Sequence, residues 1–280
     1  MSDLPGPLAP TSTQTISGLY TESFVPAGTP RGVVLITHGY AEHCGRYHEV
    51  ARVIVDAGWA VLSYDVRGHG KSPGQRGYID RFSTYLADFA AMQAAARDLA
   101  SAAAPMVLLG HSHGSLITLR ALADEQPPRA AAAIVSSPFL ALRLKIPAYR
   151  RALASVASRL APKLSQPNAL RVEDLTQDTA KQAERLADKL CFDVATARWF
   201  TEALAAQAYV FEHAGRIKLP TTWLVGHDDP IADPARSQAV AAKISGVNYH
   251  DLVGMRHEVF NEVERAKVFS ELTKALAAAG

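Results

Sequence analysis

The sequence has few cysteines and no long apolar run, and these absences exclude several classes of protein. Only 2 cysteines occur in 280 residues, Cys44 and Cys191, and they lie far apart in no metal-ligand spacing. A disulfide framework is therefore excluded and a reducing compartment is expected. No apolar run approaches the ~20 residues that a membrane-spanning helix needs. Residues 1–10 carry Asp3 and three prolines instead of an apolar segment, so we expect no signal peptide and a cytoplasmic protein.

The charges are nearly balanced, and the motifs of the common cofactor sites are missing. The chain has 29 basic and 27 acidic residues, a net charge of +2, which argues against a nucleic-acid partner. Gly68-His69-Gly70 superficially suggests a phosphate loop but lacks the lysine of a P-loop and the third glycine of a dinucleotide fingerprint. With no cluster of metal-ligand residues in sequence either, we expect neither a cofactor nor a metal.

What the sequence does contain is the pentapeptide Gly110-His111-Ser112-His113-Gly114. A short apolar run over 106–109 precedes it, and a helical pattern over 115–123 follows it. Strand, G-x-S-x-G and helix in this order predict a nucleophile elbow, in which a strained turn exposes the serine Oγ above the sheet. The alternative is a tight turn between strand and helix with an idle serine.

The rest of the chain alternates between buried strands and amphipathic helices. Residues 1–12 are proline-rich and expected to be loose, and 13–25 read as an antiparallel hairpin. Strands are predicted over 33–37, 59–64, 106–109, 130–135, 221–225 and 247–252. Helices are predicted over 46–57, 83–104 with Ser83 as the N-cap, 115–123, 234–244 and 260–279. This alternation predicts an α/β fold with a mostly parallel sheet and helices on both faces.

The alternation stops between residues 137 and 220, where the pattern is helical and shows no clear strand. A structureless loop of that length is improbable, so we predict a helical insertion over the strand ends, placed before the last two strands. The expected organisation is a core formed by 13–136 and 217–280, with a helical cap over 137–216.

A serine nucleophile needs a base and an acid to orient the base, and in this fold they follow in the order Ser, Asp or Glu, His. His257 lies directly after the last predicted strand, whereas His250 falls within that strand. Asp228 and Asp229 follow the strand over 221–225, and either could be the acid. The oxyanion requires two backbone N–H donors, which we expect from His113 and from Tyr40 in the loop after the first central strand.

These stretches together resemble one branch of a known fold family. The motifs are H-G-x-x-E-H-x-G-R-Y over 38–47, D-x-R-G-H-G-x-S over 65–72, G-H-S-x-G over 110–114, G-x-x-D over 226–229 and His257-Glu258. They are similar to the monoacylglycerol lipase and lysophospholipase branch of the α/β-hydrolases, the serine aminopeptidase S33-like enzymes. The likeness runs from about residue 31 to the C-terminus, and the first two motifs are quite specific to that branch.

The resemblance implies a fold, a site and an activity. It implies the α/β-hydrolase fold, the triad Ser112, Asp229 and His257, and Tyr40 and His113 as oxyanion donors. The family commonly has Met at the position of His113, and this departure bears on substrate preference. The His113 side chain either lines a pocket or modulates the base or the polarity of the substrate site.

The insertion supports a lipid substrate. Residues 137–172 carry seven basic residues and no acidic ones, interleaved with apolar side chains. A helix starting near Pro147 would place Tyr149, Leu153, Val156 and Leu160 on one stripe. Such a segment can dock on an anionic membrane, or its apolar stripe can pack on the core while its basic face is solvated. Four residues are expected to contact the substrate: Phe139, Leu142, Ile146 and Tyr149.

The sequence therefore predicts a cofactor-free serine hydrolase that cleaves the ester of a single long acyl chain, monoacylglycerol first. A lysophospholipase and a short-chain carboxylesterase are the alternatives within this class. A catalytically silent ligand receptor on the same fold is the alternative outside it, although the complete triad order speaks against that.

Overall fold

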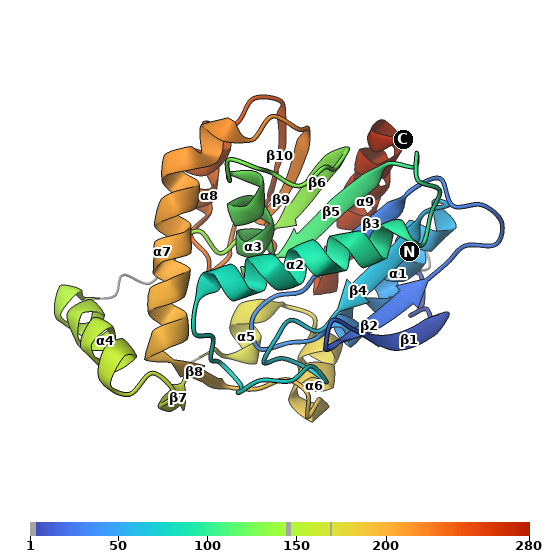
Figure 1. Ribbon diagram of the computed structural model, residues 1–280. Helices are drawn as coiled ribbons and strands as arrows, with labels where there is room; N and C mark the ends of the chain where they lie inside the picture. Colours follow the sequence, from blue (N-terminus) through green and yellow to red (C-terminus); the bar gives the residue numbers. More distant parts are fainter. Residues whose placement is uncertain (1–3, 144–146, 169) are drawn as a thin grey trace.

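The computed structural model describes residues 4–143, 147–168 and 170–280, and within these residues an eight-stranded sheet forms the centre (Figure 1). The strands follow the order β1-β2-β4-β3-β5-β6-β9-β10. β1 with β2 and β2 with β4 pair antiparallel, and all other neighbours pair parallel. The predicted mostly parallel sheet is therefore confirmed. The strands are β1 (Ser12–Ile16), β2 (Leu19–Phe24), β3 (Val33–Thr37), β4 (Ala60–Tyr64), β5 (Met106–His111), β6 (Ala132–Ser136), β9 (Thr221–Gly226) and β10 (Val247–Leu252).

The central strands are buried on both faces because helices cover each side of the sheet. Every residue of β3, β4, β5 and β6 is buried, and alternate side chains enter two separate cores. In β3, for example, Val33 and Leu35 belong to one core, whereas Val34 and Ile36 belong to the other. This explains the continuous β-branched runs in the sequence, since a strand buried on both faces has no polar side.

The helices of the core lie on the two faces of this sheet (Figure 1). α2 (Phe82–Arg97), α3 (His113–Leu122) and α8 (Pro234–Ala241) contribute to one apolar core. α1 (His48–Asp56) and α9 (Arg265–Ala279) contribute to the other. Short 3₁₀ turns precede α1 and α9, namely η1 (Cys44–Tyr47) and η3 (Val259–Asn261). The predicted helices over 46–57 and 260–279 thus each divide into a 3₁₀ turn and an α-helix.

The prediction for α2 was wrong at both ends. The helix begins at Phe82 and not after an N-cap at Ser83. The N–H of Phe82, which has no partner within the helix, donates to the Glu202 carboxylate of α7 at 2.7 Å. Such a long-range cap leaves no trace in the local sequence. The helix ends at Arg97, where Leu99 and Ala100 continue as tight turns that bond three residues back.

The N-terminal segment forms a hairpin at the edge of the sheet, as predicted. Ser17 and Gly18 make its turn with left-handed φ angles of 51° and 81°, which match the twist of the two strands. Before the hairpin, the N–H of Leu8 donates to the His48 carbonyl at 3.1 Å, and Leu4 and Leu8 pack against the core. This part of the stretch that was expected to be loose is therefore attached to the body of the protein.

Residues 137–216, which we call the insertion, lie between β6 and β9 in the chain and at one end of the sheet (Figure 1). Its helices are α4 (Ala148–Leu160), α5 (Val172–Leu175), α6 (Thr179–Ala187), α7 (Ala197–His213) and the 3₁₀ turn η2 (Ala214–Arg216). The prediction of no strand here was wrong, because β7 (Ser165–Pro167) and β8 (Val194–Thr196) form a short antiparallel pair. Three-residue strands separated by two helices are too short to give an alternating pattern.

α4 packs on α7 and leaves its apolar stripe in solvent. Ser158 of α4 is buried and shares a 2.8 Å hydrogen bond with Thr201 of α7. On the other side, Tyr149, Leu153, Val156 and Leu160 are between 53% and 81% exposed. The alternative in which this stripe packs on the core is thereby contradicted. No helix among the described residues is long and apolar enough to cross a bilayer.

Candidate active site

Ser112 lies in the sharp turn between β5 and α3, and its backbone is strained. Its φ of 49° and ψ of −112° are unusual for a residue with a side chain. The turn needs glycine on both sides. A Cβ at Gly110 would come within 2.7 Å of the Ser115 backbone, and one at Gly114 would overlap the Thr37 carbonyl. Strand, strained serine and helix are the geometry of a nucleophile elbow.

Ser112, His257 and Asp229 form one hydrogen-bonded line. The Oγ atom of Ser112 lies 2.8 Å from Nε2 of His257, and Nδ1 of His257 lies 2.7 Å from Oδ2 of Asp229. All three side chains are buried. The other carboxylate oxygen, Oδ1, accepts the N–H groups of Ile231 and Ala232 at 2.8 and 3.0 Å, which fixes the orientation of the carboxylate. This arrangement can activate a serine hydroxyl.

The electrostatics of the line favour a basic imidazole. Burial by itself lowers the pKa of His257, but the adjacent Asp229 carboxylate raises it, and the net shift is upward from 6.5. Asp228, the other carboxylate considered from sequence, instead accepts the Gly254 N–H at 3.0 Å and is exposed. The tertiary structure therefore separates two neighbouring aspartates that their position after the strand left as alternatives and between which only the family resemblance preferred Asp229.

The loop after β3 lies beside the elbow. A Cβ at Gly39 would come within 3.3 Å of the Ser112 Cβ, so the loop passes directly alongside the serine. Ala41 adopts a left-handed φ of 62°. The Tyr40 ring stacks on Trp199 of the insertion at 3.8 Å, and its hydroxyl donates to the Val194 carbonyl at 2.7 Å. The insertion thus holds the residue whose N–H is the expected oxyanion donor. The second expected donor, His113, is the first residue of α3, where an N–H has no partner within the helix.

The His113 side chain lies in an aromatic pocket. It is fully buried, and Tyr85 and Trp199 pack around its ring at centroid distances of 5.0 and 5.6 Å. Burial lowers its pKa to about 3, so the ring is neutral. The imidazole that packs against His257 is that of His111, at 5.1 Å between ring centroids. His111 was not singled out in the sequence, where only its place in G-x-S-x-G gives a signal.

The expected substrate residues of the insertion lie in different environments. Phe139 is buried, and its N–H donates to the Ser112 carbonyl at 3.1 Å. Leu142 is partly buried and pairs with Ala232 in the loop that carries Asp229. Tyr149 lies on α4 and is 61% exposed. Ile146 lies outside the described residues. The structure therefore brings Phe139 and Leu142 to the Ser112–Asp229 region and leaves Tyr149 on the outer surface.

Three potential metal ligands meet where the insertion contacts the loop after β3. Atoms of His43, Asp188 and Cys191 lie within 4.8 Å of one another, although the sequence separates them. Nδ1 of His43 accepts the Gly45 N–H at 3.2 Å, so the ring proton is on Nε2, which donates to Asp188 at 2.6 Å. In this tautomer Nε2 has no lone pair for a metal. The hydrogen bond between His43 and Asp188 links the insertion to the core.

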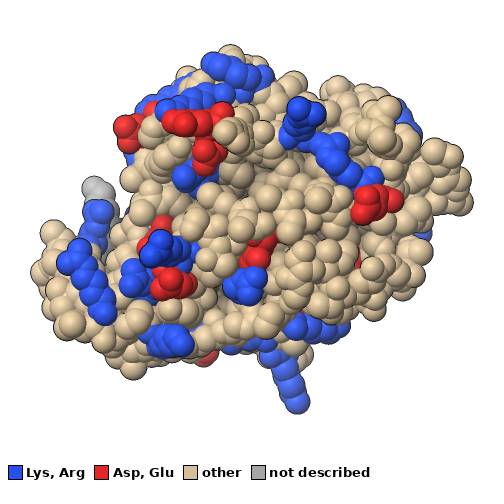
Figure 2. All heavy atoms as spheres, viewed as in Figure 1, with Lys and Arg blue, Asp and Glu red and all other residues tan. Residues whose placement is uncertain are grey.

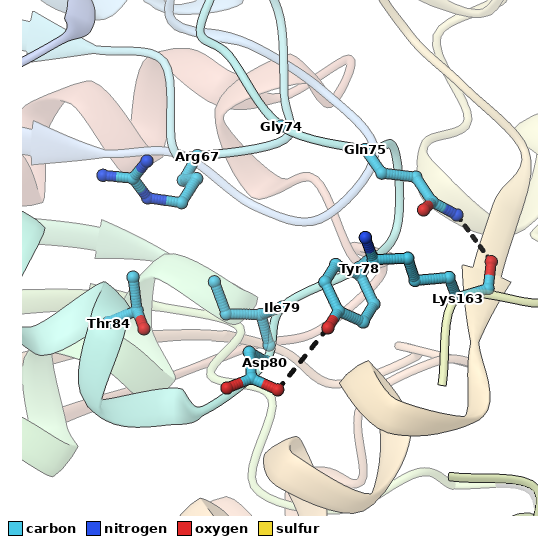
Figure 3. A pocket seen from close by; sticks show the side chains of 8 residues that line it. All are labelled: Arg67, Gly74, Gln75, Tyr78, Ile79, Asp80, Thr84 and Lys163. Carbon is cyan, nitrogen blue, oxygen red and sulfur yellow. Dashed lines mark hydrogen bonds between the residues drawn. The ribbon is translucent and has the colours of Figure 1, made fainter. Parts of the chain in front are cut away.

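A cavity of about 310 Å³ lies apart from the hydrogen-bonded line of Ser112, His257 and Asp229 (Figure 3). It separates the loop after β4 and the start of α2 from Lys163, which follows α4. Gln75 reaches across it and donates to the Lys163 carbonyl at 2.6 Å. Its lining residues are Arg67, Gly74, Gln75, Tyr78, Ile79, Asp80, Thr84 and Lys163. Because Ser112, His257 and Asp229 do not line it, this cavity is not the candidate active site.

Comparisons with known proteins show which family the chain resembles. The family model described as serine aminopeptidase, S33 (Hydrolase_4) matches residues 28–264. The chain is 31% identical over 254 residues to a monoacylglycerol lipase of Mycolicibacterium smegmatis, covering 89% of each chain. It is 28% identical to phospholipase YtpA of Bacillus subtilis, covering 87% of this chain and 94% of the relative. The crystal structure of Paleococcus ferrophilus monoacylglycerol lipase superposes with a TM-score of 0.84 at 28% identity, covering 94% and 99% of the two chains.

Proposed function

The chain belongs to the serine aminopeptidase S33 family and has the α/β-hydrolase fold, and from this premise we propose that it is a carboxylic-ester hydrolase that splits monoacylglycerols into fatty acid and glycerol. The observation that carries the proposal is the line of hydrogen bonds from Ser112 through His257 to Asp229, at 2.8 and 2.7 Å. A silent receptor on the same fold would have no need to keep this line intact.

In this mechanism the Ser112 Oγ attacks the acyl carbonyl while Nε2 of His257 takes its proton. The Tyr40 and His113 N–H groups stabilise the oxyanion of the tetrahedral intermediate. His257 then returns the proton to the glycerol oxygen, which leaves as glycerol and gives an acyl-enzyme at Ser112. Water, which gives its proton to His257, then attacks the acyl-enzyme and releases the fatty acid. Asp229 holds the imidazole in the correct tautomer and stabilises its protonated form.

The substrate class is supported by the relatives that the chain resembles over most of its length. Both the M. smegmatis protein and the P. ferrophilus structure are named monoacylglycerol lipases. The relative from B. subtilis is named a phospholipase, and this makes lysophospholipid the second candidate substrate. The two substrates share a single acyl chain and differ in the head group, so the choice between them depends on the head-group side of the site.

The insertion, residues 137–216, acts as the cap in this proposal, and α4 is its contact with lipid. The apolar stripe of α4 is exposed, and residues 147–164 contain basic residues and no Asp or Glu. In Figure 2 the tip that α4 forms carries blue and tan atoms but no red ones. An apolar stripe flanked by cations is the arrangement that binds an anionic membrane surface.

Release of free fatty acid from matched C18 monoacylglycerol and lysophosphatidylcholine, with a short-chain ester alongside, tests the proposal. The Ser112→Ala variant supplies the background rate. We expect monoacylglycerol to give the largest kcat/KM. A larger value for lysophosphatidylcholine would assign the phospholipase activity instead. Turnover of the short ester alone would leave the serine hydrolase mechanism standing and remove the lipid substrate.

A further inference from the structure

Four buried charged side chains join the insertion to the two loops that flank Ser112. Glu42 and Arg46 follow β3, Glu258 follows His257, and Arg185 lies on α6 of the insertion. We call them the buried quartet. Each of these side chains is 9% exposed or less. Two positive and two negative charges leave the quartet neutral, which satisfies the requirement that buried charges be paired.

On one side the quartet holds the loop after β3. Oε1 of Glu42 accepts the Gly39 N–H at 2.5 Å, and Oε2 accepts from Arg46 at 3.2 Å. Ala41 has the left-handed φ of 62°, a conformation that persists in a non-glycine residue only where its surroundings enforce it. Its carbonyl accepts two hydrogen bonds from the insertion, from Nη2 of Arg185 at 3.2 Å and from the Phe192 N–H at 3.3 Å.

On the other side the quartet holds the loop of His257. Glu258 is the next residue in the chain, and its Oε1 accepts from Nη1 of Arg185 at 3.3 Å. Its Oε2 accepts from Arg46 at 2.6 Å, and its backbone N–H donates to the Leu175 carbonyl of α5 at 2.7 Å. One guanidinium therefore contacts both the residue after Tyr40 and the residue after His257.

We propose that Arg185 is a positioning residue through which the insertion aligns the Tyr40 N–H and the His257 imidazole with Ser112. The inference rests on the proposed function, because it takes these two groups as the oxyanion donor and the base. The planar guanidinium of an arginine fixes the geometry between its two acceptors. The ammonium of a lysine cannot do this, because it is a point charge on a flexible side chain. Because Arg185 acts on groups that stabilise the transition state, its removal should lower kcat and leave KM nearly unchanged.

The chain offers a matched control on the same helix. Lys181 of α6 lies one turn before Arg185 and pairs with Glu49 of α1 at 2.5 Å. It ties the insertion to the core, as Arg185 does, but contacts neither flanking loop. The hydrogen bond between His43 and Asp188 keeps the insertion attached in either variant. A purely structural role predicts the same effect for both substitutions, whereas a positioning role predicts an effect for Arg185 alone.

The experiment measures kcat and KM for a water-soluble p-nitrophenyl ester with Arg185→Met, Arg185→Lys, Lys181→Met and Ser112→Ala. We expect Arg185→Met to lower kcat about 10- to 100-fold with KM within about twofold, less than the loss of a whole oxyanion donor. Arg185→Lys should fall between Arg185→Met and the wild type, and Lys181→Met should keep the wild-type kcat. Thermal melting of each variant reports whether it is folded.

Three results would overturn the inference. They are a wild-type kcat for Arg185→Met, an equal loss of kcat in Lys181→Met, and a loss of kcat/KM in Arg185→Met that comes only from a higher KM. If Arg185→Met does not fold, Arg185→Lys decides, because a folded variant with wild-type kcat contradicts the need for a guanidinium. Ser112→Ala keeps the two proposals distinguishable. Its full activity would refute the proposed function, whereas an inactive Ser112→Ala beside an unaffected Arg185→Met refutes the role of Arg185 alone.

Discussion

Nδ1 of His257 lies 2.7 Å from Oδ2 of Asp229 in a buried site, and this contact decides how activity should depend on pH. Burial lowers the pKa of His257, but the Asp229 carboxylate and the other nearby acidic groups outweigh this effect, so the net pKa lies above 6.5. Only the neutral imidazole can take the Ser112 proton, so activity is lost as pH falls through this raised pKa. A pH profile of kcat/KM for an uncharged ester should show its acidic half-point above 6.5, and a half-point below that value would contradict the assignment.

Asp229→Asn should lower kcat by about 10⁴-fold, since an amide favours the wrong imidazole tautomer and cannot stabilise the protonated ring. The neighbouring Asp228→Asn is the matched control, because the exposed Asp228 carboxylate accepts the Gly254 N–H whereas the His257 ring bonds to Asp229. We expect it to retain activity within about threefold, as is usual for an exposed substitution. Steady-state kinetics of both variants check this, and a comparable loss in the two would reopen the choice of acid.

Ser112→Ala should abolish turnover while preserving the fold, with kcat reduced by about 10⁶-fold as when a triad serine is removed. Alanine keeps the Cβ of serine, so the backbone strain at φ 49° is unchanged and gives no reason to expect unfolding. Fatty acid release measures the loss, and a fluorophosphonate probe should label the wild type and not the variant. Labelling of the variant to the same extent would show that another residue is the nucleophile.

Gly114→Ala should destabilise the protein by about 2–4 kcal/mol, because the new Cβ would overlap the backbone carbonyl of Thr37 in β3. The neighbouring carbonyl belongs to a central strand and cannot move aside cheaply. Gly6→Ala is the control, since no atom lies within 4 Å of a Cβ at that position. Thermal unfolding should show a clear loss in Tm for Gly114→Ala and none for Gly6→Ala.

Replacing Leu153 and Leu160 by Ser should weaken binding to anionic liposomes at least several-fold, because burial of these side chains in the bilayer interface supplies the binding energy. Both lie in the exposed stripe of α4, at 63% and 81% exposed. Val253→Ser, which removes an apolar side chain that is 72% exposed outside the insertion, is the control. Cosedimentation measures binding, and an unchanged bound fraction for the double variant would refute docking through α4.

Arg143 has to be left out of any charge-removal test of docking. In the sequence it is one of the seven basic residues of 137–172. In the structure its Nη1 donates to the backbone carbonyl of Asp229 at 2.7 Å. Substitution of Arg143 would therefore disturb the acid of the proposed triad as well as the charge of the surface. Arg151 and Arg159 of α4 are the better choice.

The local sequence determined the strands, the helices that cover them and the elbow at Ser112. A strand buried on both faces must be a continuous apolar run, and a G-x-S-x-G turn must carry small residues where backbones cross. These requirements act over a few residues, so they are readable without tertiary structure. The motifs also predicted the fold, because the family resemblance covered the chain from about residue 31 onward.

Only the tertiary structure decided which groups meet. Position after the strand leaves Asp228 and Asp229 as alternatives and only the family resemblance prefers Asp229, whereas in the structure the hydrogen bond to His257 distinguishes them. No role for Arg185 is predicted from the sequence, yet in the structure this residue is buried between Ala41 and Glu258. The α4 stripe would look the same whether it packed on the core or faced solvent. These contacts of His257 and Arg185 join residues 28, 73 and 144 positions apart, so they depend on how the elements pack, and no local pattern records that packing.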